Sequence, residues 1–238
     1  MAQTGNERNK PLLLISLTGL STLVGIFTVY GLGQYLNIYY VHAGDVKAAA
    51  LMHGGITTAY QVASMISAPV IAWSATRFGK RRTFVCCLAI ALVGTAVKWP
   101  CYTPAHPALM FVPMTLMGVG MSGFWVLVAS MMADVSDHAE YHQGFRNEAT
   151  VGAVFSWIYK SGLSLAFLLS GFVLVWVGFN EKLGGAQTPD TILGMRLLFS
   201  FVPAAALLIA MVCIWAYPIT EASATTTRRE LALRRGET

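Results

Sequence analysis

Residues 11–41 read PLLLISLTGLSTLVGIFTVYGLGQYLNIYYV, a run without a charged side chain. The hydrocarbon core of a bilayer is crossed by about 20 helical residues, so this run is long enough to span it. It does not alternate as a barrel strand does, and a helix satisfies its backbone hydrogen bonds within one segment. The run is also too long for the core of a signal peptide, and it has no small-residue cleavage site. We therefore expect a retained transmembrane helix after a polar cytoplasmic segment at residues 1–10.

Five further apolar runs are each long enough to cross a bilayer. They cover residues 48–76, 83–102, 108–133, 149–179 and 191–217. Hydrophobic residues make up 55% of the chain and charged residues only 11%, whereas soluble domains have about 25% charged residues. So few charges cannot build a soluble surface. The sequence predicts an all-α membrane protein with six transmembrane helices in residues 11–217 and a tail at residues 218–238.

The placement of Lys and Arg predicts the orientation of the helices. With the N-terminus inside, only Lys47 and Lys182 fall in outside loops, and three basic residues fall within the spans. The other eleven fall inside: Arg8, Lys10, Arg77, Lys80, Arg81, Arg82, Arg146, Arg228, Arg229, Arg234 and Arg235. Such an excess is typical of cytoplasmic loops, so we expect a multi-pass protein of the cell (inner) membrane with both termini in the cytoplasm.

The same distribution bears on partners outside the membrane core. The basic residues lie in short loops and in the tail, and no basic stretch is interleaved with aromatic residues. Nucleic acid is therefore not an expected partner. Membrane lipid is an expected partner because the chain is predicted to span the bilayer. The basic tail either touches anionic lipid or is disordered.

Three basic residues within the spans need an explanation. Lys98 and Arg196 lie near the outer ends of their runs, where both are expected to reach the interface by snorkelling. Lys160 lies about 16 Å from the inner start of its helix, near the midplane. Ser156, Lys160 and Ser164 share one helix face, which suggests either the wall of an aqueous path or a structural pairing. No acid lies in any predicted span, so the partner of Lys160 is expected from another chain or from a missing half.

Polar side chains also mark the first two spans. Tyr30, Gln34 and Asn37 follow one another at helical spacing in the first span. The second span carries the following hydroxyl and amide residues: Thr57, Thr58, Gln61 and Ser64. These groups are candidates to hydrogen-bond the hydroxyls of a substrate, and the alternative is that they join helices to each other.

Two predicted cytoplasmic loops carry distinctive motifs. The first is RFGKRR at residues 77–82. The second is ADVSDHAEY at residues 133–141, followed by GFRNE at residues 144–148. The second motif resembles the A-D-x-x-D-x-x-E-[YW] pattern and the following G-x-R-x-E turn of the glycoside–pentoside–hexuronide:cation symporters, and the first is similar to the basic loop of major facilitator halves. In that family the longer motif lies between helices ten and eleven, which matches the C-terminal half of a major facilitator transporter.

The resemblance implies roles for matching residues. It places Trp125 in the sugar pocket, where the indole stacks on a pyranose, and it places Lys160 beside the cation site. A polar pair precedes this lysine in the family, and here only Ser156 keeps a hydroxyl. The resemblance also implies a cytoplasmic ionic gate, whose acids are Asp134 and Asp137. Its basic member by the resemblance is Arg146. Because an acid at the inner C-terminus of a helix opposes the macrodipole, Asp134 is also expected to have a basic partner, which is Arg81, Arg82, Arg77 or a residue of the other half.

The implied function is symport of a sugar-like solute with Na⁺ or H⁺, without a cofactor. An N-terminal six-helix half or a second copy is expected as a partner, because complete family members have twelve helices. The alternative is a truncated or split subunit that has no transport activity alone. An enzyme is not expected, since no Ser–His–Asp set, H-E-x-x-H motif or phosphate loop is visible. The spacing of Asp137, His138, Glu140 and His142 permits a metal, but an exposed and charge-rich loop does not favour one.

Overall fold

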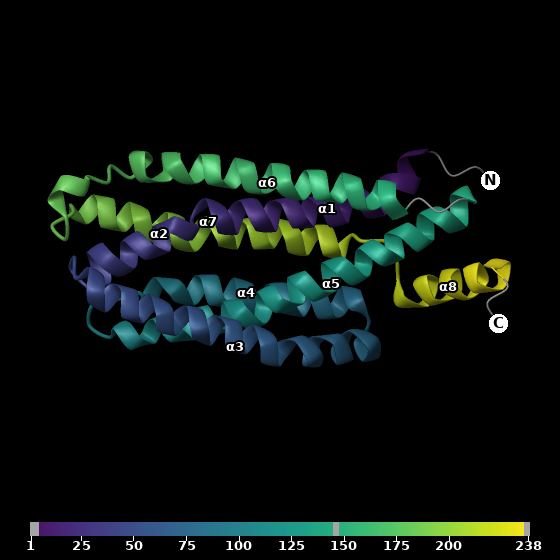
Figure 1. Ribbon diagram of the computed structural model, residues 1–238, viewed down its shortest axis with the longest axis horizontal. Coiled ribbons are helices and arrows are strands. Elements are labelled where there is room, and N and C mark those ends of the chain that lie inside the picture. Colours follow the sequence, from purple (N-terminus) through teal and green to yellow (C-terminus); the bar gives the residue numbers. More distant parts are fainter. Residues whose placement is uncertain (1–4, 145–147, 236–238) are drawn as a thin grey trace.

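The computed structural model describes residues 5–144 and 148–235, and every regular element within them is helical (Figure 1). The elements in chain order are α1 (Gly5–Thr28), α2 (Tyr30–Tyr35), the π-helical turn η1 (Leu36–Val41), α3 (Val46–Phe78), α4 (Lys80–Cys101), the 3₁₀ turn η2 (Pro107–Met110), α5 (Phe111–Gln143), α6 (Glu148–Trp176), the 3₁₀ turn η3 (Glu181–Leu183), α7 (Pro189–Trp215) and α8 (Glu221–Arg235).

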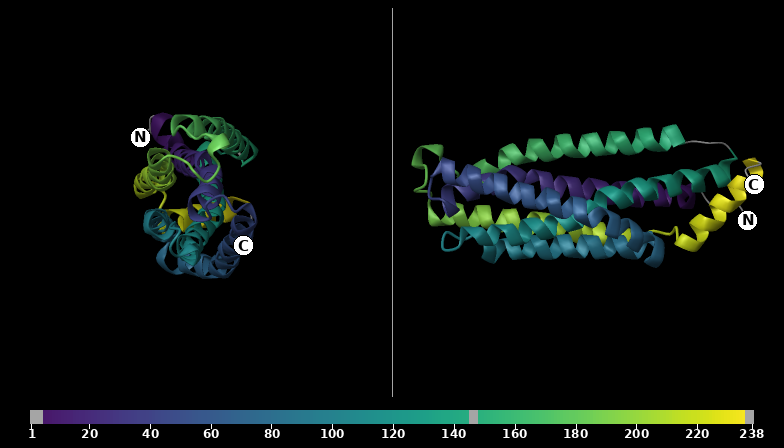
Figure 2. Two further views of the ribbon diagram at one scale, coloured as in Figure 1. Left: turned by 90° about the vertical axis from the view of Figure 1, so that its left-hand side faces the viewer. Right: turned by 60° about the horizontal axis from the view of Figure 1, so that its bottom comes forward.

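Six long helices run along the long axis of the molecule in two groups (Figures 1 and 2). In one group α1 packs against α6 and α7, and in the other α5 packs against α3 and α4. Contacts between α4 and α7 join the groups. The start of α1, the end of α5 and the whole of α8 lie at the same end of the bundle (Figure 1). Under the predicted orientation this is the cytoplasmic end.

Five helical segments are long and apolar enough to cross a membrane: Lys10–Val41, Lys80–Cys101, Pro107–His142, Glu148–Trp176 and Pro189–Trp215. The second predicted span corresponds to α3, which has 33 residues but is not among the five. Its polar side chains, which include His53 and Gln61, lower its hydropathy. The six predicted runs therefore each have a long helix, although α3 is less apolar than expected.

The first predicted span is not one continuous helix. Val29 separates α1 from α2 with φ −107° and ψ 7°, and the backbone N–H of His42 donates to the Asn37 carbonyl, five residues back. A π-helical turn adds a residue to each turn, so it changes the helical phase. Residues after Leu36 therefore point in directions that regular helical spacing does not predict.

Glycines let α5 approach its neighbours closely. A Cβ atom added at Gly118 would run into the backbone of Tyr60 on α3, and one at Gly120 would lie 2.6 Å from the Cβ of Ala91 on α4. These small residues therefore have a packing role between the helices. The three helices of this group are therefore held together where α5 passes between α3 and α4.

The tail forms a helix instead of a disordered segment. Helix α8 begins after Thr220, whose Oγ1 accepts a hydrogen bond from the backbone N–H of Ser223, and such a bond is typical of a helix N-terminus. The Arg234 side chain donates to the carbonyl of Tyr141, and its guanidinium lies 4.7 Å from the ring centroid of the same residue. These contacts hold α8 against the end of α5.

Candidate functional site

A cavity of about 350 Å³ lies between the two groups of helices. Its walls come from α1, α2, α3, α4, α5 and α7, so it lies where the bundle halves face each other. The polar and aromatic side chains that line it include Tyr30, Gln34, His53, Thr57, Tyr60, Gln61, Lys98, Tyr102, Trp125 and Phe199. Aromatic rings, amides, hydroxyls and one ammonium therefore face a single space between the two groups of helices.

Lys98 is the charged group of this cavity. The residue is only 5% exposed, and its Nζ lies 4.1 Å from the ring centroid of Phe199 on α7. The prediction that Lys98 snorkels to the interface is therefore wrong. The reason is that α7 packs over this end of α4 and encloses the side chain, which the sequence of α4 alone does not reveal. Among the described residues, every ion pair lies at the opposite end of the bundle, and none includes Lys98.

Arg196, which is also expected to snorkel, is enclosed by other groups. Its guanidinium donates to the Trp99 carbonyl at 2.7 Å and stacks at 4.4 Å from the Trp99 ring and 5.1 Å from the Tyr40 ring. These contacts join α7 to α4 and η1. Arg196 therefore has a packing role.

Three of the predicted substrate residues meet in the cavity. Trp125 lines it from α5, and Tyr30 and Gln34 line it from α2. The Oε1 atom of Gln34 is buried and accepts no hydrogen bond from the described residues. A buried amide oxygen without a donor is costly, so this atom is available to a ligand or to water. The binding role of these residues stays a prediction.

Two other predicted substrate residues lie elsewhere. Asn37 is 1% exposed and does not line the cavity; its Nδ2 donates to the Ala49 carbonyl at 2.8 Å. It thereby joins η1 to α3. Ser156 lies exposed on α6, outside the cavity. Of the hydroxyls in the second span, Thr57 lines the cavity, whereas Thr58 donates to the Gly54 carbonyl of its own helix.

Lys160 lies on the outer face of α6. Its side chain is exposed, as are those of Ser156 and Ser164, so the predicted polar stripe is present but faces away from the cavity. The nearest connection to the cavity is Tyr159, whose ring centroid lies 6.0 Å from that of Trp125. An ammonium at this depth is costly when it faces lipid, so its position favours contact with another polypeptide or with water.

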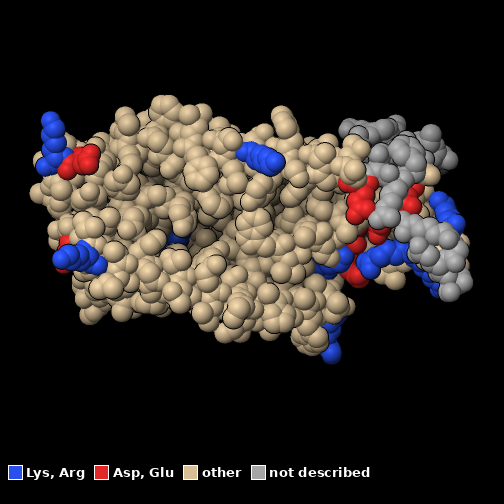
Figure 3. Space-filling model, viewed as in Figure 1, with Lys and Arg blue, Asp and Glu red and all other residues tan. Residues whose placement is uncertain are grey.

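Charges gather at the two ends of the bundle, and only a few basic side chains interrupt the uncharged surface between them (Figure 3). At the predicted cytoplasmic end, Asp134 is 6% exposed and its carboxylate lies 2.6 Å from Lys80 Nζ and 3.4 Å from Arg228. Arg228 also lies 3.6 Å from Glu221. These four residues, from α4, α5 and α8, form the cytoplasmic charge cluster.

This cluster differs from the predicted gate in its basic members. The ion pairs of Asp134 are made by Lys80 and Arg228, and not by Arg81 or Arg82 within the part of the chain that the structure describes. Lys80 is the first residue of α4 and reaches back to α5, whereas Arg228 comes from the tail, whose helix the sequence does not predict. Asp137 lies about one turn further along α5, which continues through the whole predicted loop motif to Gln143.

The remaining predicted gate residues have separate positions. Arg81 donates to the Tyr217 carbonyl at 3.4 Å, and its guanidinium lies 5.8 Å from the Trp215 ring centroid. Arg82 is exposed at the start of α4. Arg146 lies outside the described residues. The sequence thus locates the charged end of the bundle but not the pairing within it.

The amino-acid sequence matches the model of one known protein family. Residues 6–221 match the model of the MFS/sugar transport protein family, which is nearly the whole chain. Because the match extends from α1 to the start of α8, it includes every helix that lines the cavity.

Curated relatives cover the same region. The chain is 28% identical to the glucuronide carrier protein homolog of Escherichia coli over 221 residues, which are 90% of this chain and 45% of that protein. It is 25% identical to the isoprimeverose transporter of Lactiplantibacillus pentosus over 83% of this chain and 39% of that protein. It is 30% identical to the gentisate transporter of Corynebacterium glutamicum over 68% of this chain and 34% of that protein. The chain therefore spans about half the length, or less, of these relatives.

Proposed function

The chain belongs to the MFS/sugar transport protein family, and from this premise we propose that it forms the C-terminal six-helix half of a secondary transporter. The complete transporter moves a sugar-like solute together with Na⁺ or H⁺ by alternating access. The cavity lined by Trp125, Gln34 and Lys98 supports this proposal, because an indole, an amide and an ammonium face one space between the helix groups.

The chemistry of the cavity fits a solute with an apolar face, hydroxyl groups and an anionic group. An indole such as Trp125 offers a flat surface to a sugar ring, and the amides of Gln34 and Gln61 can exchange hydrogen bonds with hydroxyls. The described residues that line the cavity include no carboxylate, so the Lys98 ammonium is available to a carboxylate of the solute. Glucuronides and gentisate, after which two relatives are named, both carry such a group.

A second six-helix unit is part of the proposal. The outer face of α6 exposes Lys160 and Ser156 beside large apolar side chains such as Trp157, which is 71% exposed. We assign this face to contact with the N-terminal half or a second copy, which supplies the acids of the cation site. The site on this side is completed by Lys160, in keeping with its predicted coupling role.

The test is uptake by cells or vesicles that contain this chain together with a separately expressed N-terminal six-helix half of a relative. We expect cation-dependent uptake of a labelled glucuronide, and loss of that uptake with Trp125→Ala. The matched control is Trp73→Ala, which removes an exposed tryptophan of α3 that does not line the cavity. Equal uptake by both variants would contradict the binding role of Trp125.

The same uptake measurement tests the alternative that the chain is a truncated or split subunit with no transport activity alone. If the two halves associate on co-purification but no solute of the panel is bound or moved, the chain is a subunit for assembly only. If the chain alone gives uptake that depends on Lys160, a second copy replaces the N-terminal half. Cell fractionation and accessibility labelling test the proposed cell membrane location and the cytoplasmic position of both termini.

A further inference from the structure

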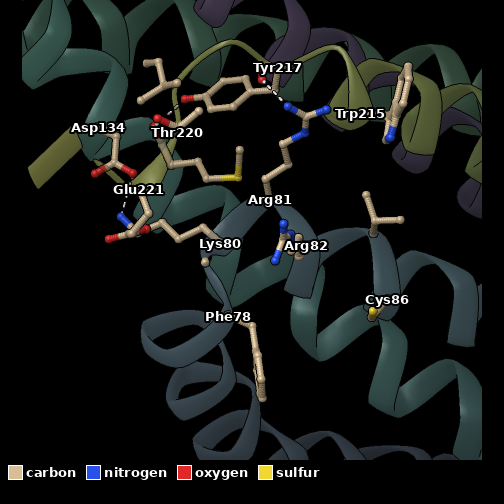
Figure 4. A pocket seen from close by; sticks show the side chains of 14 residues that line it. Phe78, Lys80, Arg81, Arg82, Cys86, Asp134, Trp215, Tyr217, Thr220 and Glu221 are labelled. Carbon is tan, nitrogen blue, oxygen red and sulfur yellow. Dashed lines mark hydrogen bonds and ion pairs between the residues drawn. The ribbon is translucent and has the colours of Figure 1, made fainter. Parts of the chain in front are cut away.

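A second and larger cavity, of about 750 Å³, opens at the end of the bundle that carries the cytoplasmic charge cluster. It lies where the turn between α3 and α4, the end of α7 and the start of α8 meet. Figure 4 shows Asp134, Glu221 and Lys80 on one side of this space and Arg81 and Trp215 on the other. The cavity lined by Trp125, Gln34 and Lys98 shares no lining residue with this second cavity.

The acids of this cavity are already neutralised. Asp134 is paired with Lys80 and Arg228, and Glu221 lies 3.6 Å from Arg228. Arg81 makes only a long hydrogen bond of 3.4 Å to the Tyr217 carbonyl and a ring contact with Trp215. Arg82 lines the cavity and, within the described part of the chain, has no carboxylate within ion-pair distance. Two guanidinium groups are thus left to attract an anion.

The backbone adds donors at the same place. Gly79 precedes α4 with φ +87°, a conformation that favours glycine, and it has no side chain to cap the helix. The first backbone N–H groups of α4, which belong to Lys80, Arg81 and Arg82, therefore have no side-chain acceptor at the helix cap. Such donors strengthen the attraction that the two guanidinium groups already exert on an anion.

The other wall of the cavity is apolar and exposed. Trp215 is 71% exposed and Phe78 is 55% exposed, and Cys86 is also exposed. The two aromatic side chains lie at the ends of α7 and α3, where aromatic rings face the headgroup region of a bilayer, and Cys86 lies nearly two turns into α4. A small soluble anion would make no use of this wall. The cavity therefore fits an amphipathic anion whose apolar part continues along the bundle.

We propose that this cavity binds an anionic phospholipid of the cytoplasmic leaflet, with its phosphate held by Arg81 and Arg82 and its glycerol and first acyl carbons against Trp215. Basic pockets between helices on the cytoplasmic side are suited to such headgroups. The site rests on the proposed orientation but not on the proposed solute. It gives Arg81 and Arg82 a ligand of their own, in place of the predicted pairing with Asp134.

The test uses the full chain, purified in detergent and mixed with phosphatidylglycerol or phosphatidylcholine, with lipid retention measured by native mass spectrometry. We expect phosphatidylglycerol to be retained in preference to phosphatidylcholine. The double variant Arg81→Gln/Arg82→Gln is expected to weaken that retention by roughly tenfold or more, because charge-assisted hydrogen bonds are lost. The matched control is Arg77→Gln/Arg229→Gln, which removes two exposed charges near the same end of the bundle without touching the cavity.

Three outcomes overturn the site. They are equal loss in the two double variants, equal retention of the two lipids, and full displacement of phosphatidylglycerol by inorganic phosphate, which would indicate a site for a soluble anion. Because binding is measured without transport, a failure here is distinguishable from a failure of the transport proposal.

A second measurement does not depend on the arginine variants folding. Brominated phosphatidylglycerol quenches tryptophan fluorescence at short range, and the conservative variant Trp215→Phe removes the proposed reporter. We expect the wild-type protein to lose more emission than Trp215→Phe on titration with this lipid. Identical quenching of the two proteins would overturn the position of the lipid.

Discussion

Two buried charges at opposite ends of the bundle are treated differently. Asp134, on α5, is 6% exposed and has Lys80 and Arg228 as partners. Lys98, on α4, is 5% exposed and lies on the ring of Phe199, with no carboxylate among the described residues that share its cavity. The first charge is satisfied within the chain, whereas the second faces an open space.

The presence or absence of an ion-pair partner distinguishes a buried charge that stabilises the fold from one that binds a ligand. A paired buried charge fixes the helices that carry the partners, and its loss leaves the partner uncompensated. A buried charge without a partner is costly to keep and contributes nothing to folding, so its presence is best explained by a ligand. We therefore propose that Asp134 serves the assembly of the helices and that Lys98 recognises the solute.

The largest effect on stability is expected from Asp134→Ala. Lys80 would lose its partner in a site where its side chain is 17% exposed, so the free energy of unfolding should fall by about 3 kcal/mol. The measurement is denaturant unfolding of the purified chain in micelles. Asp190→Ala, at the exposed start of α7, is the control and should change stability by less than about 1 kcal/mol. An equal change in both variants would remove the distinction between the two buried charges.

Lys98→Met should show the opposite pattern. In the assembled transporter, affinity for a carboxylate-bearing solute is expected to fall roughly tenfold to a hundredfold, because a charge-assisted hydrogen bond is lost. Folding stability should not fall, since an apolar side chain of similar length replaces a buried ammonium. Equilibrium binding of an acidic and a neutral glycoside checks this result. If affinity for both solutes falls equally, Lys98 shapes the cavity and does not read the charge.

Phe199→Leu is expected to have a smaller effect. The ring lies under the Lys98 ammonium and packs edge-on against Tyr102 at 5.0 Å, so unfolding free energy should fall by about 1 kcal/mol. Phe201→Leu is the control, because Phe201 is 61% exposed two residues along the same helix. A comparison of the two melting curves measures how far the ring supports the unpaired charge. No difference between them would show that Lys98 is held by the cavity walls alone.

Arg228→Gln should have the smallest effect. This residue is 47% exposed and Lys80 remains beside Asp134, so the expected loss is about 0.5 kcal/mol, and salt should reduce it further. Unfolding at low and high ionic strength provides the test. A loss as large as that of Asp134→Ala would mean that α8, and not α4, satisfies the buried acid.

The sequence predicts the long helices well because apolar runs and bilayer thickness are local properties. The predicted run 191–217 lies within two residues of Pro189–Trp215 at each end, and the run 83–102 lies within three residues of Lys80–Cys101. The break at Val29 and the π-helical turn after it were missed, since no proline or charge marks them. Gln34 lines the cavity, whereas Asn37 donates to the Ala49 carbonyl on α3.

The site is predictable only in part because it depends on contacts between distant segments. Trp125, Tyr30 and Gln34 were named from a family resemblance and from helical spacing, and the structure brings them into one cavity. The sequence predicts Lys98 at the interface because it gives depth only along the residue's own helix. Its enclosure comes from Phe199, about a hundred residues later in the chain. A lysine followed closely by Pro100 at a helix end is the one local feature that could have directed attention to this position.

Helix α5 is longer than a bilayer core requires. Its 33 residues measure about 50 Å, although a bilayer core is only about 30 Å thick. The glycines at 118 and 120 clamp it near its first third, against Tyr60 and Ala91. The helix is therefore longer than the core is thick, and its far end, which carries Asp134 and contacts α8, continues beyond the core without a break in the helix.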